Sequence, residues 1–228
     1  MVRKANATKT GIIQVANRLF LENGYTNTSV KAICQRLNIS TGNLTFHFPT
    51  KEHMLAVLVR LLCDFQWDMM LSESQQEDAL GAICMELIAM AAICEQNELV
   101  KDFYLTAYTS PMTLDIIRKS DVARSKIVYG KYCPDWSHDR FVEVETLVSG
   151  IEYAMLMTTT HSLGLNDRIR GAMDTIMMLY QIPADIRQET LEKSMSVDYD
   201  SLGRQIFSGF IQYVDRMEDR TLEQFITT

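Results

Sequence analysis

The sequence lacks the patterns that mark strands, disulfide frameworks and metal sites. Apolar and polar residues do not alternate over any sustained stretch, which excludes a fold built from half-buried strands. The five cysteines are odd in number and scattered, and none forms a C-x-x-C pair, so neither a disulfide framework nor a zinc site is indicated. The four histidines show no ligand spacing with one another or with the cysteines. We therefore expect no metal and no cofactor.

Signals for export, membrane insertion and catalysis are also missing. The first seven residues contain no apolar segment of the kind that signal peptides carry, and Glu86 interrupts the most apolar stretch, Ile83 to Cys94. We therefore expect a cytoplasmic protein. The sequence shows no Gly-rich phosphate loop, nucleophile motif or persuasive pair of carboxylates, so an enzyme is not expected. A helical enzyme of unknown reaction stays as an alternative, because a missing motif does not prove missing activity.

Helical periodicity runs through the whole chain and predicts an all-α fold. Turn and cap residues such as Ser110-Pro111 and Ile182-Pro183 separate the helical segments. Three short helices are expected before residue 48. The longer helices that follow are expected at about 52–72, 76–96, 98–108, 112–132, 138–163, 167–181, 184–195 and 201–218.

The three short helices near the start of the chain have local reasons for their positions. Apolar residues from Ile12 to Phe20 recur at three- and four-residue steps, as on one face of a helix. We expect the Thr28 hydroxyl to cap the second helix, and Asn38 to take the left-handed backbone of a tight turn after it. Ser40 can then cap a third helix over residues 41–47. This order predicts a helix-turn-helix.

Charge distinguishes this segment from an ordinary helical bundle. Residues 1–60 contain eight Lys or Arg and two acidic residues, a net charge of +6. The other 168 residues contain 14 basic and 27 acidic side chains, a net charge of −13. The overall charge of −7 therefore averages a basic module, which attracts phosphate, and an acidic remainder, which is repelled by it.

Two motifs in the first 55 residues resemble the DNA-binding segment of TetR/AcrR-type transcriptional regulators. They are Ser29-Val-Lys-Ala-Ile33 and Asn38-Ile-Ser-Thr-Gly-Asn-Leu-Thr-Phe-His-Phe-Pro-Thr-Lys-Glu52. The family pattern has a Tyr directly after the apolar residue that corresponds to Leu44, whereas this chain has Thr45. The resemblance implies an N-terminal three-helix helix-turn-helix domain, residues 1–52, and a larger helical domain for effector binding and dimerisation, residues 53–228.

The expected DNA contacts fall into two groups. Gly42 allows the recognition helix to approach the floor of the major groove, and Asn43 is the first choice for a base contact because its amide can both donate to and accept from adenine. The phosphate backbone is expected to be held by Thr28, Ser40, His47 and Lys51. The full set of expected DNA-binding residues is Thr28, Ser40, Thr41, Gly42, Asn43, Thr45, His47 and Lys51.

The larger domain has the composition of a domain with an apolar pocket. Twelve of the fourteen methionines lie beyond Arg60, together with both tryptophans, and the flexible Met side chain suits a deformable cavity. We expect an unidentified apolar or amphipathic effector there. A buried Glu152 would need a cation or hydrogen-bond donors and could select a positively charged ligand, whereas an exposed one would face solvent or an arginine. The candidate effector-binding residues are Trp67, Phe103, Tyr104, Tyr108, Glu152, Tyr153, Met157 and His161.

The last predicted helix has an apolar stripe. TetR-like regulators pair through their last helices, so the resemblance implies a homodimer, and a dimer reads two half-sites of a palindromic DNA operator. The candidate interface residues are Leu202, Ile206, Phe210, Tyr213 and Met217.

The function expected is a DNA-binding repressor that a small-molecule effector releases from its operator. Activation instead of repression stays open. A redox-responsive regulator that senses oxidants through Cys34 or Cys63 is an alternative. A structural DNA-binding protein without an effector is another.

Overall fold

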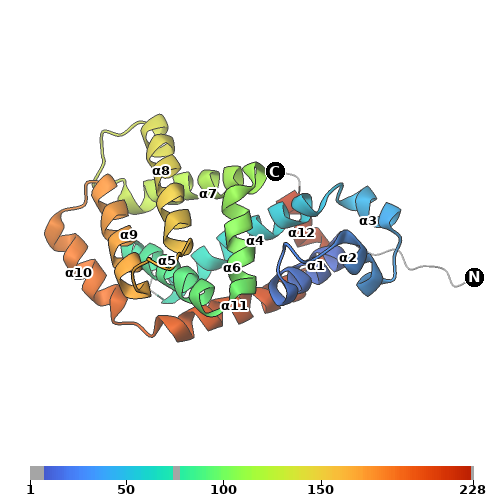
Figure 1. Ribbon diagram of the computed structural model, residues 1–228. Coiled ribbons are helices and arrows are strands. Elements are labelled where there is room, and N and C mark those ends of the chain that lie inside the picture. Colours follow the sequence, from blue (N-terminus) through green and yellow to red (C-terminus); the bar gives the residue numbers. More distant parts are fainter. Residues whose placement is uncertain (1–7, 74–77, 227–228) are drawn as a thin grey trace, which may run out of the picture.

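The computed structural model describes residues 8–73 and 78–226, and that part of the chain contains twelve helices and no strand (Figure 1). The all-α prediction is confirmed. The helices are α1 (Lys9–Asn23), α2 (Val30–Leu37), α3 (Thr41–His47), α4 (Lys51–Glu73), α5 (Ala79–Gln96), α6 (Glu98–Thr109), α7 (Pro111–Tyr129), α8 (His138–Leu156), α9 (Leu165–Leu179), α10 (Ala184–Met195), α11 (Tyr199–Asp215) and α12 (Asp219–Ile226).

One predicted helix end was wrong, and one helix was not predicted. The helix expected to reach residue 163 ends at Leu156, because the backbone becomes extended at Met157, with φ −76° and ψ 113°. No helix was predicted after residue 218, yet α12 follows there, and its Leu222 is fully buried. The expected start of the helix at Gln76 lies outside the described residues, and Asp78 caps α5 through its side chain.

Helices α1, α2 and α3 form the helix-turn-helix, at the right of Figure 1. Asn38 has the left-handed backbone expected of it, with φ 53° and ψ 41°, and the Ser40 side chain accepts from the Asn43 amide to cap α3. The expected cap of α2 was wrong by one residue. The Ser29 side chain accepts from the Ala32 amide, and the Thr28 hydroxyl turns inward.

Helix α5 is the central helix of the larger domain, and it packs against α4, α6, α9, α10 and α11. Among the described residues it alone is long and apolar enough to cross a membrane, and 67% of it is buried inside the structure. Its apolar character therefore reflects burial on nearly all sides by other helices.

Helices α11 and α12 return along the molecule to the helix-turn-helix (Figure 1). The Gln14 side-chain amide donates to the carbonyl of Asp215, at 2.9 Å, and Arg18 pairs with the Asp215 carboxylate at 2.6 Å. Lys9 pairs with Glu223 on α12 at 2.8 Å. The two C-terminal helices therefore fix the position of α1 through these hydrogen bonds and ion pairs.

The C-terminal stripe predicted to form a dimer interface is already covered within one chain. Four of its residues are buried, with exposed fractions of 8% or less, and α11 packs closely on α5 and α4. Gly203 allows this approach, because a Cβ there would lie 3.0 Å from the Ala89 carbonyl oxygen. The stripe stabilises the monomer, which corrects the interface prediction for Leu202, Ile206, Phe210 and Met217, while Tyr213 is half-buried against Phe65.

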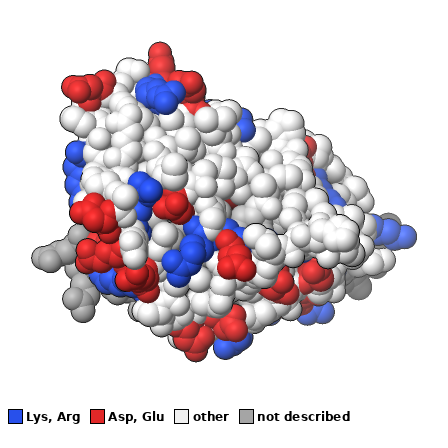
Figure 2. Space-filling view, turned by 60° about the vertical axis from the view of Figure 1, so that its left-hand side comes forward, with Lys and Arg blue, Asp and Glu red and all other residues white. Residues whose placement is uncertain are grey.

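A different helical face stays uncovered. Helices α8 and α9 pack on each other and present small and apolar residues outward, among them Leu147, which is 53% exposed, and Met178, which is 55% exposed. Apart from the backbone of their own helices, no part of residues 8–73 and 78–226 lies within 4 Å of a Cβ built at Gly150 or Gly171. Figure 2 brings this side of the molecule forward and shows broad uncharged areas beside clusters of charged side chains.

Substitutions at Asn38 test the turn between α2 and α3. Asn38 is exposed, so its conformation rather than its packing constrains the position. We expect Asn38→Gly to leave the free energy of unfolding nearly unchanged and Asn38→Val to lower it by about 1–2 kcal/mol, since a β-branched residue is strained in left-handed backbone. Urea unfolding followed by circular dichroism measures both. Equal losses in the two variants would contradict this explanation.

Candidate nucleic-acid interface and ligand cavity

The recognition helix α3 presents a polar surface to solvent. Thr41, Gly42 and Thr45 are exposed, and Asn43 and His47 are half-buried. Outside the backbone of α3 itself, no atom of the described residues lies within 4 Å of a Cβ built at Gly42. Packing within the chain therefore does not require a glycine at this position, and the open space in front of it is available to a partner.

Thr28 and Lys51 face the interior of the domain instead. The Thr28 hydroxyl is buried and donates to the carbonyls of Leu19, at 2.9 Å, and Gly24, at 2.7 Å. The Lys51 ammonium donates to the carbonyls of Tyr25 and Thr28, at 2.7 and 2.9 Å. It also lies 4.0 Å from the centroid of the Tyr25 ring, and burial lowers its pKa. The Thr28 hydroxyl therefore holds the loop before α2 against the end of α1, which corrects the expectation that it contacts phosphate. Lys51 joins the same loop to the start of α4, and its contact with phosphate stays a prediction.

Sequence reasoning missed an exposed aromatic residue on α3. Phe48 is buried, at 2% exposure, whereas Phe46 is 84% exposed, and its ring lies 5.2 Å from that of His47. Phe46 directly follows Thr45, the position at which the family pattern has a tyrosine. The surface of the recognition helix therefore carries an aromatic ring, one residue later than the pattern predicts.

Comparison with known proteins agrees with this geometry. Residues 12–58 match the model of the bacterial regulatory proteins of the tetR family. In this segment the chain is therefore similar to TetR-family regulators. The HTH-type transcriptional regulator UidR of Escherichia coli K12 is 39% identical over 59 residues, which are 26% of this chain and 30% of that protein. UidR of Shigella flexneri gives the same values, so the match spans about a third of the length of these curated relatives.

Solved structures of TetR regulators overlap more of the chain at lower identity. TylP from Streptomyces fradiae is 16% identical with a TM-score of 0.47, over 82% of this chain and 90% of that one. CprB from S. coelicolor A3(2) is 17% identical with a TM-score of 0.43, over 86% of this chain and 96% of that one. Both TM-scores lie below 0.5, so the chemistry of the larger domain has to be judged from its own residues.

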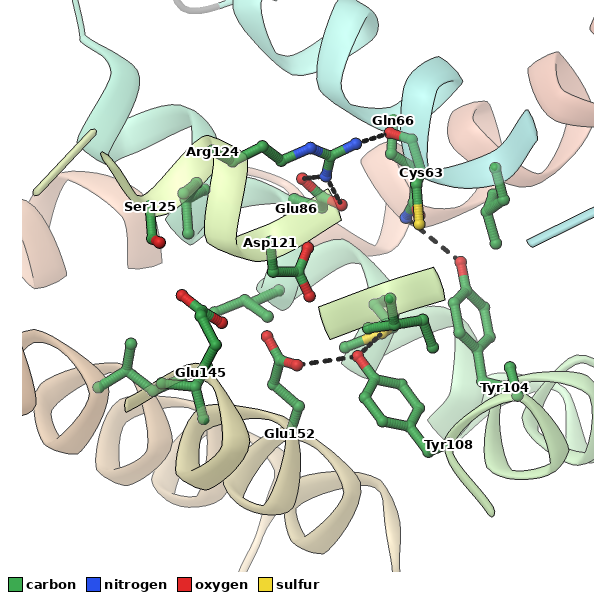
Figure 3. A pocket seen from close by; sticks show the side chains of 18 of the residues that line it. Cys63, Gln66, Glu86, Tyr104, Tyr108, Asp121, Arg124, Ser125, Glu145 and Glu152 are labelled. Atoms are coloured by element: carbon green, nitrogen blue, oxygen red, sulfur yellow. Dashed lines mark hydrogen bonds and ion pairs between the residues drawn. The ribbon is translucent and has the colours of Figure 1, made fainter. Parts of the chain in front are cut away.

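A cavity lies inside the larger domain, among α4, α5, α6, α7, α8 and α9 (Figure 3). The cavity has a volume of about 80 Å³, whereas one water molecule needs roughly 10–15 Å³ on the same scale. The cavity therefore has room for a small organic molecule. Its apolar wall includes Leu62, Leu87, Met90 and Ile176.

Four carboxylates and one guanidinium line this cavity. Arg124 pairs with Glu86 at 3.3 Å, donates a short hydrogen bond to the carbonyl of Cys63, and lies over the Trp67 ring at 5.3 Å. Tyr108 donates to Glu152 at 3.0 Å, and Tyr180 donates a short hydrogen bond to Glu145. Asp121 accepts no hydrogen bond from the described residues.

Burial and mutual repulsion favour the protonated forms of these acids. Desolvation raises the pKa of Glu152 well above its usual range, and the neighbouring Asp121 and Glu145 raise it further. Desolvation and the charge of Glu145 do the same to the pKa of Asp121. Desolvation also raises the pKa values of Glu86 and Glu145, although Arg124 opposes this at Glu86 and Tyr180 opposes it at Glu145.

The cavity brings together only some of the residues predicted to bind an effector. Tyr104, Tyr108 and Glu152 line it. The other five do not. Trp67 lies beneath Arg124 and beside a surface groove, and Phe103 is fully buried in the core. Tyr153 is half-buried away from the cavity, and the residues after α8, Met157 and His161, are exposed.

Sequence reasoning missed Glu86, Asp121, Arg124 and Glu145. One signal was available: Glu145 lies seven residues before Glu152, so both occupy one face of α8 beside buried valines. Asp121 and Arg124 gave no comparable signal, because nothing in the sequence of α7 shows which face meets the other helices.

The cysteines show no sign of a thiol sensor. Cys34 is buried, and burial raises the pKa of the Cys63 thiol, with the nearby Asp121 adding to the shift. A reactive thiol needs a lowered pKa and solvent access. The redox alternative therefore finds no support at either residue.

The raised carboxyl pKa values make stability depend on pH. Between the unfolded pKa of about 4 and the raised folded pKa, the folded chain binds more protons, so stability falls as pH rises through this window. Glu152→Gln and Asp121→Asn remove this loss. We expect each to raise the melting temperature by about 2 °C or more at about pH 8, and by less at about pH 5.

Differential scanning fluorimetry across pH measures this gain. Glu143→Gln is the matched control, because Glu143 is an exposed glutamate on the same helix. A gain that is independent of pH, or equal in the control, would show that these buried carboxylates do not strain the fold.

Proposed function

We propose that the protein is a cytoplasmic, dimeric, sequence-specific DNA-binding regulator and not an enzyme. It represses transcription until a small-molecule effector binds in the cavity and releases it from a palindromic operator. The main support is that α4 is one continuous helix. It begins at Lys51, which donates to the loop before α2, and it continues past the residues that line the cavity. The basic charge of the first 60 residues supports binding to phosphate.

The proposed DNA contacts come from α3. Thr41, Asn43 and Thr45 face base edges in the major groove, with Gly42 allowing close approach of the backbone and Asn43 reading an adenine. Ser40 and His47 contact phosphates at the two ends of the helix. The exposed ring of Phe46 packs on the sugar or on a thymine methyl beside Thr45.

The proposed dimer forms through the uncovered face of α8 and α9. Leu147, Gly150 and Ala154 on α8 recur at three- and four-residue steps, and Gly171, Thr175 and Met178 on α9 do the same. All six are exposed in the single chain. Small residues allow two copies of this helix pair to approach closely, and a two-fold axis there would present two recognition helices to half-sites about 34 Å apart.

The proposed switch uses residues 1–52 as the DNA-binding domain and 53–228 as the effector domain, joined by α4. Val59, Leu62, Cys63 and Gln66 of α4 line the cavity, so a ligand that displaces them moves the start of the same helix. The start of α4 is fixed to the helix-turn-helix through Lys51. A ligand shifts the DNA affinity by the difference between its affinities for the two arrangements.

Selection of bound sequences from random duplex DNA tests DNA recognition. We expect the wild type to enrich a palindrome and Asn43→Ala to bind that palindrome about 10–100-fold more weakly, because one bidentate base contact contributes about 1–3 kcal/mol. Asn23→Ala, an exposed asparagine at the end of α1, is the control. Enrichment of no sequence beyond a salt-sensitive background would contradict the proposal.

Charge placed on the α8–α9 face tests the dimer. We expect Leu147→Glu to convert the dimer to a monomer in sedimentation velocity and to weaken operator binding, because a buried unpaired charge is unfavourable at a packed interface. Ile127→Glu is the matched control, since Ile127 is 70% exposed on α7, outside this face. A Leu147→Glu variant that sediments as a dimer would rule out this interface.

A further inference from the structure

We propose that the cavity binds a small organic cation, a protonated amine or quaternary ammonium group on an apolar or aromatic body. This inference names the chemical class of the effector and to that extent rests on the proposed function. It goes beyond the general expectation of an apolar or amphipathic ligand, because the charges that line the cavity select among such ligands.

The charges of the cavity do not balance. Glu86, Asp121, Glu145 and Glu152 line it, whereas Arg124 is the only Lys or Arg among its lining residues. Arg124 already pairs with Glu86 and donates to the Cys63 carbonyl. Among the described residues that line the cavity, three acids therefore have no cation beside them.

Glu152 shows where a cation would bind. The residue is 7% exposed, and its Oε2 accepts from Tyr108 at 3.0 Å, while no described residue donates to its Oε1. Asp121 extends from α7 toward Glu152 across the cavity, and Glu145 lies about two turns before Glu152 on α8 (Figure 3). A buried acid is either protonated or paired with an opposite charge, and the described residues that line the cavity offer Asp121 and Glu152 no cation besides Arg124. A cation that enters from outside the chain would therefore stabilise their ionised forms.

The rest of the lining fits the body of such a ligand. Tyr104, Tyr108, Tyr129 and Tyr180 place aromatic rings around the carboxylates, and aromatic rings attract organic cations as well as apolar groups. In their ionised forms the same acids repel anions, and in their protonated forms they offer an anion no positive charge. An ammonium group between Asp121 and Glu152 would also compete with Arg124 for negative charge, and Arg124 is the residue that holds the α4 carbonyl at Cys63.

Three probes of one size but different charge test this selectivity. Benzylamine is a cation at neutral pH, benzyl alcohol is its neutral counterpart, and benzoate is an anion. We expect isothermal titration calorimetry to show benzylamine binding at least about tenfold more tightly than benzyl alcohol, since charge-assisted contacts contribute more than neutral ones, and to show no binding of benzoate. Phenyltrimethylammonium, whose charge does not depend on pH, should bind as benzylamine does.

Charge-neutral variants locate the site. Glu152→Gln and Asp121→Asn should each remove most of the preference for benzylamine over benzyl alcohol. Glu143→Gln, the exposed control on α8, should keep it. Circular dichroism and the melting temperature show that each variant is folded, and neutralising a strained carboxylate should not unfold the chain.

Three results would overturn the assignment. They are equal affinity for the amine and the alcohol, no detectable binding of either cation, and a preference that survives in both cavity variants. The calorimetry needs no DNA, so it stands even when no operator is found. Cation binding that leaves an operator complex intact would support the ligand class and refute the effector role in the proposed function.

Discussion

The packing of the larger domain depends on one buried guanidinium that only partly neutralises the acids around it. Arg124 of α7 donates to Glu86 of α5 and to the carbonyl of Cys63 on α4, so three helices meet at a single side chain. A buried ion costs several kcal/mol unless nearby charges and hydrogen bonds offset that cost. The relative positions of α4, α5 and α7 are therefore tied to the geometry around Arg124. Tyr108 and Tyr180 offset part of the cost at Glu152 and Glu145, but hydroxyls supply no charge.

The same contact reaches the recognition helix because α4 is rigid and continuous. Cys63 and Lys51 lie twelve positions apart on this helix, a distance of about 18 Å at 1.5 Å per residue. One end is held by Arg124, and the other holds the loop before α2 through two backbone carbonyls. Arg60, between them, donates to the Phe225 carbonyl on α12. A shift of α4 must therefore also change how the C-terminal helices hold α1.

The sequence predicted best the features that local chemistry decides. The turn at Asn38 and the cap at Ser40 depend on neighbouring residues alone, and the structure has both. The cap of α2 was assigned to Thr28 instead of Ser29, because two hydroxyl residues adjoin and only tertiary packing turns one of them inward.

Features that depend on how helices pack were predicted less well. The apolar stripe from Leu202 to Met217 was read as a surface for a second chain, but periodicity shows only that a face is buried, and α5 of the same chain buries it. In the cavity, Glu152 was recognised as unusual within an apolar helix, whereas Asp121 was not, since the acids near it, Glu145 and Glu86, come from other helices. The proposed response to a ligand also gives a reason for keeping these acids in the core. Well-packed apolar residues in their place would stabilise the domain whether or not a ligand is bound. Buried acids that lack a cation make the free energy of the domain depend on what occupies the cavity. A ligand can shift a conformational equilibrium only by the difference between its affinities for the two states.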